Sequence, residues 1–387
     1  MTKSASVDAM PGWGDFSGRI WLNTAHQGAV PLRAAEAAKE AIAWKVSPSE
    51  LTQARFDETP QRLREAIAGL VNAAAEDIVL ANSASYGLNV IAQAYPWREG
   101  DEIVVMEGDF PSDILPWLLA AEQSGARVVR VKPRRRVIEP DELAAAITTR
   151  TRLFCCPWVH SLSGYAVDLA GLGAVCRDRG VIFVVNASQA LGVRPVDLAS
   201  APVDALVSVG FKWLCGPYGT GFAWIGSDLM ARLKATKAYW LSMMTAQDLG
   251  GAKVEVVLKP RSGARSYDIF GTANFFNARP LTESITDLTG IGIPRIAAHA
   301  QALVERFISG LDPKRYRIDS PTEPGERRST LIFFSDRDPA RNPEVHRALA
   351  ENRIDVAFRA GSLRLAPHLY NSSSDIDRAL TVLNDRR

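Results

Sequence analysis

The feature that most constrains the fold of this chain is a regular alternation of helical and strand-like segments over residues 60–225. Stretches with apolar residues at helical spacing, such as 61–71 and 169–179, alternate with short apolar runs such as 102–106 and 181–185. The last run, Val-Ile-Phe-Val-Val, has no polar face, which is typical of a strand whose sheet is covered by helices on both sides. The alternation therefore predicts a large α/β domain with α/β/α layers.

The pattern also predicts the individual elements and the limits of the domains. Helices are predicted at 61–71, 86–94, 114–124, 141–146 and 169–179, and strands at 77–80, 102–106, 126–131, 153–157, 181–185, 205–209 and 221–225. Beyond residue 280, helices at 293–311 and 343–351 and strands at 330–334 and 363–365 predict a smaller α+β domain, with a loop or hairpin at 245–268 before it. We expect an N-terminal arm at 1–16, a large domain at 17–275 and a small C-terminal domain at 276–387.

Length and charge exclude several classes of protein. At roughly 100 to 200 residues per domain, 387 residues allow a chain of more than one domain. The 45 basic and 43 acidic residues give a net charge of +2, too weak a field to hold nucleic acid or an anionic membrane. The apolar runs are far shorter than the roughly 20 residues of a membrane-spanning helix. Because residues 1–13 lack the apolar core of a signal peptide, we expect a cytoplasmic protein.

The four cysteines, at 155, 156, 176 and 215, are too few for a disulfide framework in a chain of this size. None of their spacings matches a zinc-binding pattern. We therefore expect structural thiols and no metal site.

Chemistry is expected at the turns that leave the strands, because ligands of open α/β sheets sit outside the carboxyl ends of the strands. The first unusual turn, Ala81-Asn-Ser-Ala-Ser-Tyr-Gly87, is small and polar and lies between a predicted strand and a predicted helix. Free N–H groups and a hydroxyl at a helix N-terminus form an anion site, most often for phosphate. The alternative is an ordinary N-cap by Ser83 or Ser85.

Two further turns bring aromatic and polar side chains to the same edge of the sheet. The turn Glu-Gly-Asp-Phe-Pro-Ser-Asp contains Phe110 and Asp113, which are either site residues or a core residue and a helix cap. The turn Asn-Ala-Ser-Gln ends a buried strand and contains Asn186 and Gln189. Buried amides must be satisfied, so these two bond either the backbone or a polar ligand.

The fourth turn contains a lysine in an apolar setting. Lys212 follows an apolar strand and begins the glycine-rich run Lys-Trp-Leu-Cys-Gly-Pro-Tyr-Gly-Thr-Gly. An apolar setting is unfavourable for a charged side chain unless its amine takes part in binding or catalysis. A desolvated lysine has a depressed pKa and forms a Schiff base with a carbonyl group. The alternative is a lysine exposed at the surface.

In this order the four turns resemble the class V branch of the fold-type I pyridoxal-phosphate (PLP) enzymes. That group includes cysteine desulfurases, kynureninases, isopenicillin N epimerase-like proteins and several aminotransferases. The resemblance runs from Trp21-Leu-Asn-Thr-Ala-His-Gln-Gly28 through Phe270-Gly-Thr-Ala-Asn274 to Leu363-Arg-Leu-Ala-Pro-His-Leu-Tyr-Asn371, nearly the whole chain. It implies the fold-type I architecture of PLP-dependent transferases, a large mixed-sheet domain plus a small one, with pyridoxal 5'-phosphate as the cofactor.

The resemblance also implies a role for each matching residue. Lys212 would form the Schiff base and move protons at the substrate Cα, and Arg364 would pair with the carboxylate of an amino acid substrate. The implied cofactor contacts are Ala84 and Ser85 to the phosphate, Phe110 against the ring, Gln189 to the ring hydroxyl and Thr272 to the phosphate of a neighbouring subunit. The implied substrate-side residues are His26, Tyr218 and Arg359. The contact from Thr272 implies a homodimer with shared active sites.

Three departures from the family pattern bear on the reaction. Asn186 stands where the family has an aspartate that keeps the pyridine nitrogen protonated. Either Asp113 takes over that task, or the ring is largely unprotonated. The segment 356–364 is short and lacks the mobile-loop cysteine that a desulfurase needs, so persulfide transfer is disfavoured. Phe211 replaces a histidine or tyrosine that reaches the phosphate in relatives.

The sequence therefore predicts a PLP-dependent enzyme that acts on an amino acid, with transamination as the first expectation. The same residues also suit elimination, epimerisation and oxidative or decarboxylative reactions, because the orientation of the scissile bond to the ring decides among them. A further alternative is a non-catalytic PLP-binding protein, in which Asn186 and Phe211 mark a decayed site.

Overall fold

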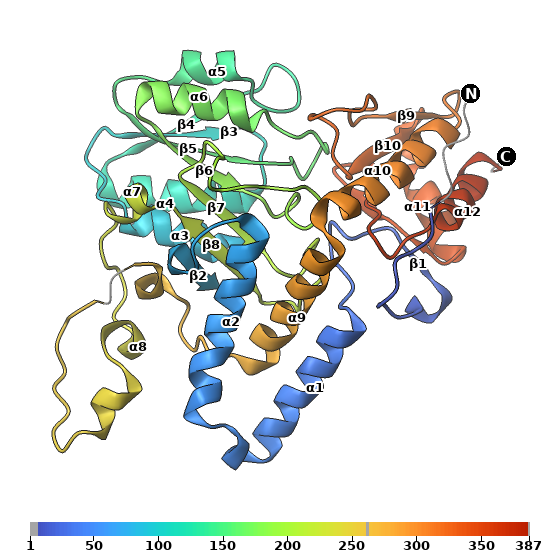
Figure 1. Cartoon of the computed structure of the whole chain (residues 1–387). Coiled ribbons are helices and arrows are strands. Elements are labelled where there is room, and N and C mark those ends of the chain that lie inside the picture. Colours follow the sequence, from blue (N-terminus) through green and yellow to red (C-terminus); the bar gives the residue numbers. More distant parts are fainter. Residues whose placement is uncertain (1–6, 261–262, 386–387) are drawn as a thin grey trace.

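The main feature of this computed structural model, which describes residues 7–260 and 263–385, is a seven-stranded sheet between two layers of helices (Figure 1). The strand order is β2 (Ile78–Ala81), β8 (Gly221–Ile225), β7 (Ala205–Val209), β6 (Ile182–Asn186), β5 (Thr151–Pro157), β3 (Glu102–Met106) and β4 (Arg127–Val131). Neighbouring strands are parallel except at β8, which is antiparallel to both β2 and β7. The predicted mixed sheet is confirmed.

The two faces of the sheet are covered by different helices. In β3, Val104 and Met106 belong to the core on the side of α2 (Gln53–Val71), α5 (Pro140–Ala146), α6 (Leu169–Arg179) and α9 (Phe275–Ile291). Ile103 and Val105 belong to the core on the opposite side, with α3 (Ala84–Ala94), α4 (Leu115–Ser124) and α7 (Ser227–Met230). Because successive strand residues point to opposite faces, burial of both faces explains why the central strands have no polar side.

A second, smaller sheet is built from C-terminal residues. Its antiparallel strands are, in order, β12 (Ala357–Arg359), β13 (Ser362–Leu365), β10 (Ile332–Asp336) and β9 (Tyr316–Ile318). Their core also contains apolar side chains of α10 (Ile293–Gly310), α11 (Asn342–Glu351) and α12 (Ser373–Asn384). The smaller α+β part is thus confirmed, while the predicted domain limits remain predictions.

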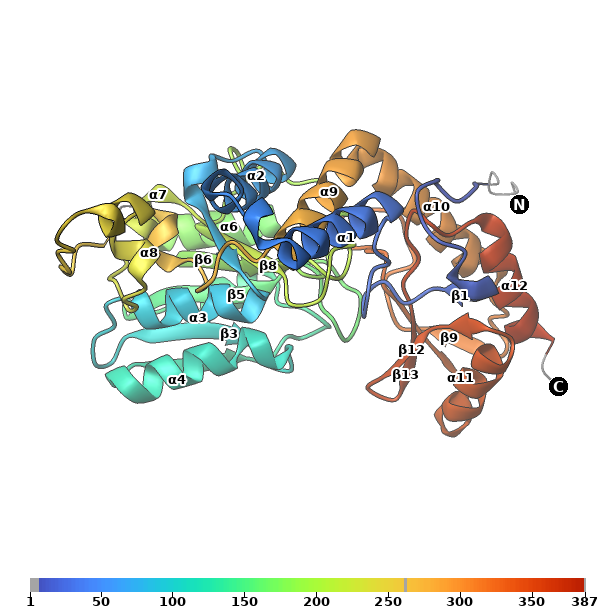
Figure 2. The ribbon, with the colours of Figure 1, turned by 90° about the horizontal axis from the view of Figure 1, so that it is seen from below.

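A short strand near the N-terminus joins this C-terminal part. β1 (Ile20–Trp21) pairs in parallel with β11 (Ile354–Asp355), and Figure 2 shows β1 beside the C-terminal helices. From there residues 22–31 lead to the helix that begins at Leu32, and the chain enters the large sheet at β2.

Five helices of the described structure and the start of another were not predicted: the missing helices are α1 (Leu32–Val46), α7, α8 (Trp240–Met243), α9 and α12. α1 (Leu32–Val46) buries only Ala34, Ala37, Ala41 and Trp44, so its apolar stripe consists mostly of alanines and gives a weak periodic signal. α2 begins at Gln53 instead of residue 61, after a cap in which the Thr52 hydroxyl accepts the N–H of Arg55. α1 and α2 both pack against α9.

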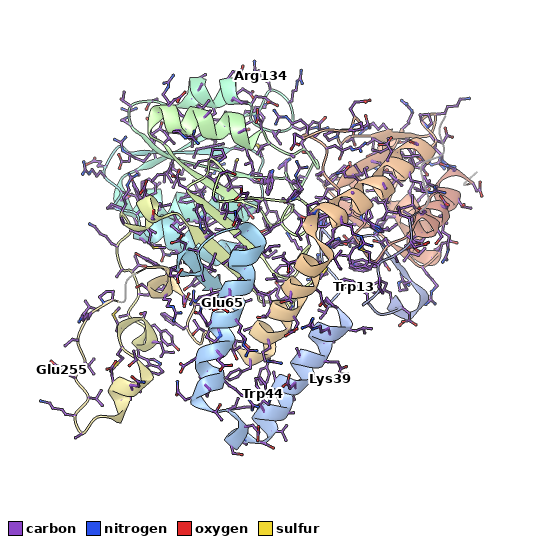
Figure 3. All side chains as sticks on the ribbon, in the orientation of Figure 1. Trp13, Lys39, Trp44, Glu65, Arg134 and Glu255 are labelled. Atoms are coloured by element: carbon purple, nitrogen blue, oxygen red, sulfur yellow. The ribbon has the colours of Figure 1, made fainter. Side chains whose placement is uncertain are left out.

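The remaining short elements are irregular. They are α8 (Trp240–Met243) and the 3-10 helices Phe16–Gly18, Pro48–Glu50, Ala75–Asp77, Pro111–Asp113, Ala246–Gly250, Ala264–Tyr267 and Pro339–Arg341. The predicted loop at 245–268 contains no strand in its described residues, and Figure 3 shows Glu255 on this projecting segment. Among the described helices, none combines the length and apolar content needed to cross a membrane.

The chain that follows β1 packs tightly against the turn that carries Lys212. Gly28 donates its N–H to the carbonyl of Phe211 over 2.9 Å. A Cβ atom at Gly28 would overlap the carbonyl oxygen of Lys212 and lie 3.2 Å from Cα of Cys215. Only glycine allows such an approach of two backbones. The position of the Lys212 turn therefore depends on a residue in the segment between β1 and α1.

Gly28→Ala should destabilise the folded protein by about 3 kcal/mol, because the added methyl group forces the Lys212 turn to move. The measurement is the free energy of unfolding from urea titrations. The control is Gly69→Ala, an exposed position inside α2 with no atom within 4 Å of the added Cβ. That substitution should raise stability by about 0.5 to 1 kcal/mol. Unchanged stability of Gly28→Ala would contradict the close contact.

Candidate active site

A cavity of about 530 Å³ lies at the carboxyl ends of the parallel strands, between the two sheets. Every predicted site residue except Thr272 lines it, namely His26, Ala84, Ser85, Phe110, Asp113, Asn186, Gln189, Lys212, Tyr218, Arg359 and Arg364. The large sheet and its turns supply most of these residues, and the β12–β13 hairpin supplies the arginines. The four unusual turns therefore meet at one place.

One end of the cavity is the N-terminus of α3. The Ser83 hydroxyl caps the helix by accepting the N–H of Tyr86 over 3.1 Å, so the predicted N-cap is made by Ser83. The Ser85 hydroxyl donates to Oγ of Ser112 over 2.8 Å. The first N–H groups of a helix have no partner within the helix. Because Ala84 and Ser85 line the cavity, this end is equipped to bind an anion.

Lys212 lines the cavity just beyond β7 and is partly buried. Burial and the nearby Arg364 lower the pKa of its amine to about 8, against a smaller opposing effect of Asp113. The amine lies 6.0 Å from the centre of the Phe110 ring. Phe110 is 44% exposed, unusually high for an aromatic residue that lines a cavity. The prediction of a desolvated lysine is favoured over that of a surface lysine.

Asn186 is bonded to Asp113 inside the cavity. Its Nδ2 donates to Oδ1 of Asp113 over 2.6 Å, and its Oδ1 accepts the N–H of Ser188 over 3.0 Å. Burial raises the pKa of Asp113 to about 7, although the hydrogen bond from Asn186 and the charge of Lys212 act to lower it. The Asn186 amide is thus oriented by protein groups at both ends.

A second buried acid, Asp109, lies behind this pair. Its Oδ1 accepts the N–H of Phe110 over 2.7 Å, while its Oδ2 has no hydrogen-bond partner among the described residues. Burial, and then the charge of Asp113, raise the pKa of Asp109 well above its usual value. The sequence analysis did not single out Asp109, Ser112 or Ser188, although all three stand within the quoted turns.

Both ends of the Gln189 amide form hydrogen bonds with protein groups. Its Nε2 donates to the carbonyl of Ala25 over 3.1 Å, and its Oε1 accepts from Nε1 of Trp213 over 3.0 Å. One Nε2 hydrogen is left to face the cavity. The expected contact between Gln189 and a ring hydroxyl therefore stays a prediction that the geometry allows.

The other end of the cavity is rich in positive charge. Arg364 is 4% exposed, and its Nε has no partner among the described residues. Burial and the nearby Arg359 lower the pKa of Arg364 to about 10. His26 lies at the exposed side, and its pKa is lowered by partial burial and by Arg359, Arg364 and Lys212. Tyr218 is 72% exposed, with its ring centre 4.6 Å from that of Phe211.

No cysteine lines this cavity. All four cysteines are free and buried, and burial raises the pKa of the Cys215 thiol, which therefore stays protonated. The segment before Arg364 is a hairpin in which Ala360 and Gly361 form the turn. There is no room there for a loop that would carry a cysteine. Within residues 7–260 and 263–385, no group of His, Cys, Asp and Glu side chains is arranged to hold a metal ion.

Thr272 does not reach the cavity of its own chain. It lines a separate cavity of about 340 Å³ together with Tyr239, Arg265 and residues of α2. The predicted contact between Thr272 and the phosphate of a neighbouring subunit therefore stays a prediction.

Comparisons with known proteins show which family the chain resembles in sequence. The family description "Aminotransferase class-V" matches residues 35–373. A probable cysteine desulfurase of Methanothermobacter thermautotrophicus is 26% identical over 335 residues, which cover 82% of this chain and 80% of that protein. Isopenicillin N epimerase of Amycolatopsis lactamdurans is 25% identical over 340 residues, which cover 83% of each protein.

Solved structures share the fold. The complex of the cystine C–S lyase C-DES with its product cysteine persulfide has a TM-score of 0.86 at 21% identity, covering 96% of this chain and 99% of that one. In a related C-DES structure, with a TM-score of 0.88 at 21% identity and covering 98% of this chain and 100% of that one, glycine is covalently linked to the PLP cofactor. The match over most of the sequence, together with the buried lysine at the strand ends, shows that the chain belongs to the class V aminotransferase family of PLP-dependent enzymes.

Proposed function

We propose that this protein is an aminotransferase that acts on an amino acid through a covalent bond between Lys212 and pyridoxal phosphate. The observation that carries the proposal is the buried Lys212 amine, whose pKa is lowered to about 8, in a cavity with an unpaired arginine. A lysine with such a pKa has a sizeable neutral fraction near pH 7 to 8. The neutral amine is the form that attacks an aldehyde.

The residues present fit pyridoxal phosphate at three points. The α3 N-terminus, with Ala84 and the Ser85 hydroxyl, offers hydrogen-bond donors for the phosphate. The exposed face of Phe110 offers a surface for the pyridine ring close to Lys212. Asp113 offers a buried carboxyl group. The cavity volume of about 530 Å³ also lies within the usual range of ligand sites.

Each protein group then has a defined task. When bound, pyridoxal phosphate supplies an electron sink that stabilises negative charge at the substrate Cα. Arg364 binds the substrate carboxylate and thereby fixes the direction of the bonds at Cα. The Lys212 amine, in its neutral form, would take the proton from the substrate Cα as a general base and return it elsewhere as a general acid.

We assign to Asp113 the negative charge that keeps the pyridine nitrogen protonated. Asn186 stands at the usual position but carries no charge, and both ends of its amide are already bonded, to Asp113 and to the N–H of Ser188. A positive charge on a neighbouring ring nitrogen would lower the pKa of Asp113 from about 7, as Lys212 already does in part. Asn186 therefore acts as the residue that positions Asp113.

Transamination is favoured over persulfide transfer and two-base epimerisation because these two alternatives need groups that the cavity lacks. Persulfide transfer needs a reactive thiol, and the thiols of this chain are all buried outside the cavity. Epimerisation by two bases needs a second buried base opposite Lys212. The remaining candidates, His26 and Tyr218, lie at the exposed side of the cavity. Transamination needs a single base, which Lys212 supplies.

A homodimer is part of the proposal. Thr272 belongs to a motif that in relatives reaches the phosphate of the neighbouring subunit, and it lies outside the cavity of its own chain. Its position supports a site that a second copy of the chain completes.

The proposed function predicts that the wild-type protein binds pyridoxal phosphate in a form that borohydride fixes to Lys212. With an amino acid alone it should release one equivalent of keto acid per site, and it should turn over continuously only when a second keto acid is added. Peptide mapping, and keto acid and ammonia assays, are the measurements. Continuous release of ammonia without an added keto acid would contradict transamination and indicate a lyase or an oxidative reaction.

Lys212→Ala should lose both borohydride fixation and turnover. Lys237→Ala is a matched control, because Lys237 also has a pKa lowered to about 8 but lies over the Tyr86 ring outside the cavity. It should retain both properties. Fixation or turnover that persists in Lys212→Ala would disprove the role of Lys212.

A further prediction concerns the acid Asp113 and the amide Asn186. Asp113→Asn should lower turnover by about a hundredfold or more, because the charge that holds a proton on the ring nitrogen is lost. The double variant Asp113→Asn with Asn186→Asp restores one carboxylate to the pair and should recover most of the activity. The absorbance of the bound cofactor against pH should shift in the single variant and return in the double variant. Full activity of Asp113→Asn would contradict the assignment.

A third prediction concerns the stability of the cofactor-free protein. The pKa of Asp113 is about 7 in the folded state and near 4 in the unfolded chain, so the folded state holds more protons between these values. The contribution of Asp113 to the free energy of unfolding should therefore be fully present below pH 4. It should be lost as pH rises towards 7. The free energy of unfolding of Asp113→Asn, measured by urea titration, should fall less steeply over that range than that of the wild type. An equal slope in both proteins would contradict the raised pKa.

A further inference from the structure

The β12–β13 hairpin presents two arginines on a single face. Ala357 pairs with Arg364 and Arg359 pairs with Ser362 across the two antiparallel strands. Residues that face each other across such a pair lie on the same side of the sheet, as do residues two apart in one strand. Arg359 and Arg364 therefore lie on the same side, and both line the cavity.

The turn of the hairpin keeps this arrangement fixed. It consists of Ala360 and Gly361, with φ angles of 49° and 78°. A two-residue turn with both residues in the left-handed region matches the twist of the flanking strands and sets their register. The two guanidinium groups are therefore carried by a short, regular hairpin instead of a long loop.

The charge around these arginines is not balanced by the protein. Within the described part of the chain, neither Arg359 nor Arg364 forms an ion pair, and the Nε of Arg364 is buried without a partner. Among the described residues that line the cavity, Asp113 is the only carboxylate, and it is bonded to Asn186. His26 also lines the cavity, and its lowered pKa favours the neutral imidazole, so it does not balance the arginines either. One substrate carboxylate on Arg364 would leave Arg359 without a counter-charge.

We propose that the substrate carries a second anionic group, which Arg359 binds while Arg364 binds the α-carboxylate. The substrate class is thus an amino acid with an acidic side chain, or the corresponding keto acid. The assignment of the two groups follows from burial, because Arg364 is buried in the cavity and Arg359 is exposed at its rim. A lone exposed arginine is ordinary, but Arg359 shares its face of the hairpin with an unpaired arginine. This inference rests on the proposed function and deepens it.

The experiment compares unreactive acids that bind to the holoenzyme. Glutarate and butyrate have similar carbon chains and lack an amino group, but only glutarate has a second carboxylate. Their dissociation constants are measured by calorimetry and by the change in cofactor absorbance. Glutarate should bind about tenfold more tightly than butyrate at low salt, and the difference should shrink as salt rises. 3-Phosphonopropionate tests whether the second group is a phosphonate-like anion instead of a carboxylate.

Three variants separate the role of Arg359 from that of general charge. Arg359→Gln should weaken the binding of glutarate about tenfold and change the binding of butyrate by no more than about twofold. Arg364→Gln should weaken the binding of both acids. Arg347→Gln removes one positive charge from an exposed position of α11 outside the cavity. It should change neither dissociation constant.

The outcomes distinguish this inference from the proposed function. Equal binding of glutarate and butyrate by the wild type, or equal weakening of both in Arg359→Gln, would overturn the second anion site. An effect of Arg347→Gln as large as that of Arg359→Gln would also overturn it. In each of these cases borohydride fixation and amino transfer would stand unaffected. Selective binding of glutarate without amino transfer would instead refute the aminotransferase and retain the anion site.

Discussion

The burial of the Lys212 amine is the constraint on which the rest of the site depends. A charged ammonium group is costly to bury, so the folded chain favours the neutral amine and lowers the pKa to about 8. The nearby Arg364 acts in the same direction. Holding that amine in place requires close backbone packing, which the contact between Gly28 and the Lys212 turn provides. The same packing that buries the Lys212 amine therefore also lowers its pKa.

The acid and the arginines of the cavity lie at different ends. Among the described residues that line it, the one carboxylate is Asp113, which is bonded to Asn186 on the side of the large sheet, while the two arginines of the β12–β13 hairpin lie on the side of the small sheet. A ligand with a cationic ring nitrogen and carboxylate groups matches this separation in direction and sign. Because the two ends belong to different sheets, the separation exists only when both sheets are in place.

The sequence predicted the strands well and their partnerships less well. Strands such as 102–106 and 205–209 match the structure because both faces are buried and the apolar runs are clear. α1 was missed because its stripe is made of alanines. At the site, the turns were found from glycine, proline and polar residues after strands. The bond from Asn186 to Asp113 joins residues 73 positions apart, so it depends on a sheet order in which only β5 separates β6 from β3.

The short hairpin has two consequences for the reaction at once. A two-residue turn at Ala360 and Gly361 leaves no loop for a cysteine nucleophile, so sulfur transfer loses its acceptor. The same turn sets the register that brings Arg359 and Arg364 to one face. A longer connection would give the chain more conformations at this point and would weaken that fixed spacing. Under the proposed function, the length of this one turn therefore bears both on sulfur transfer and on the charge of the substrate.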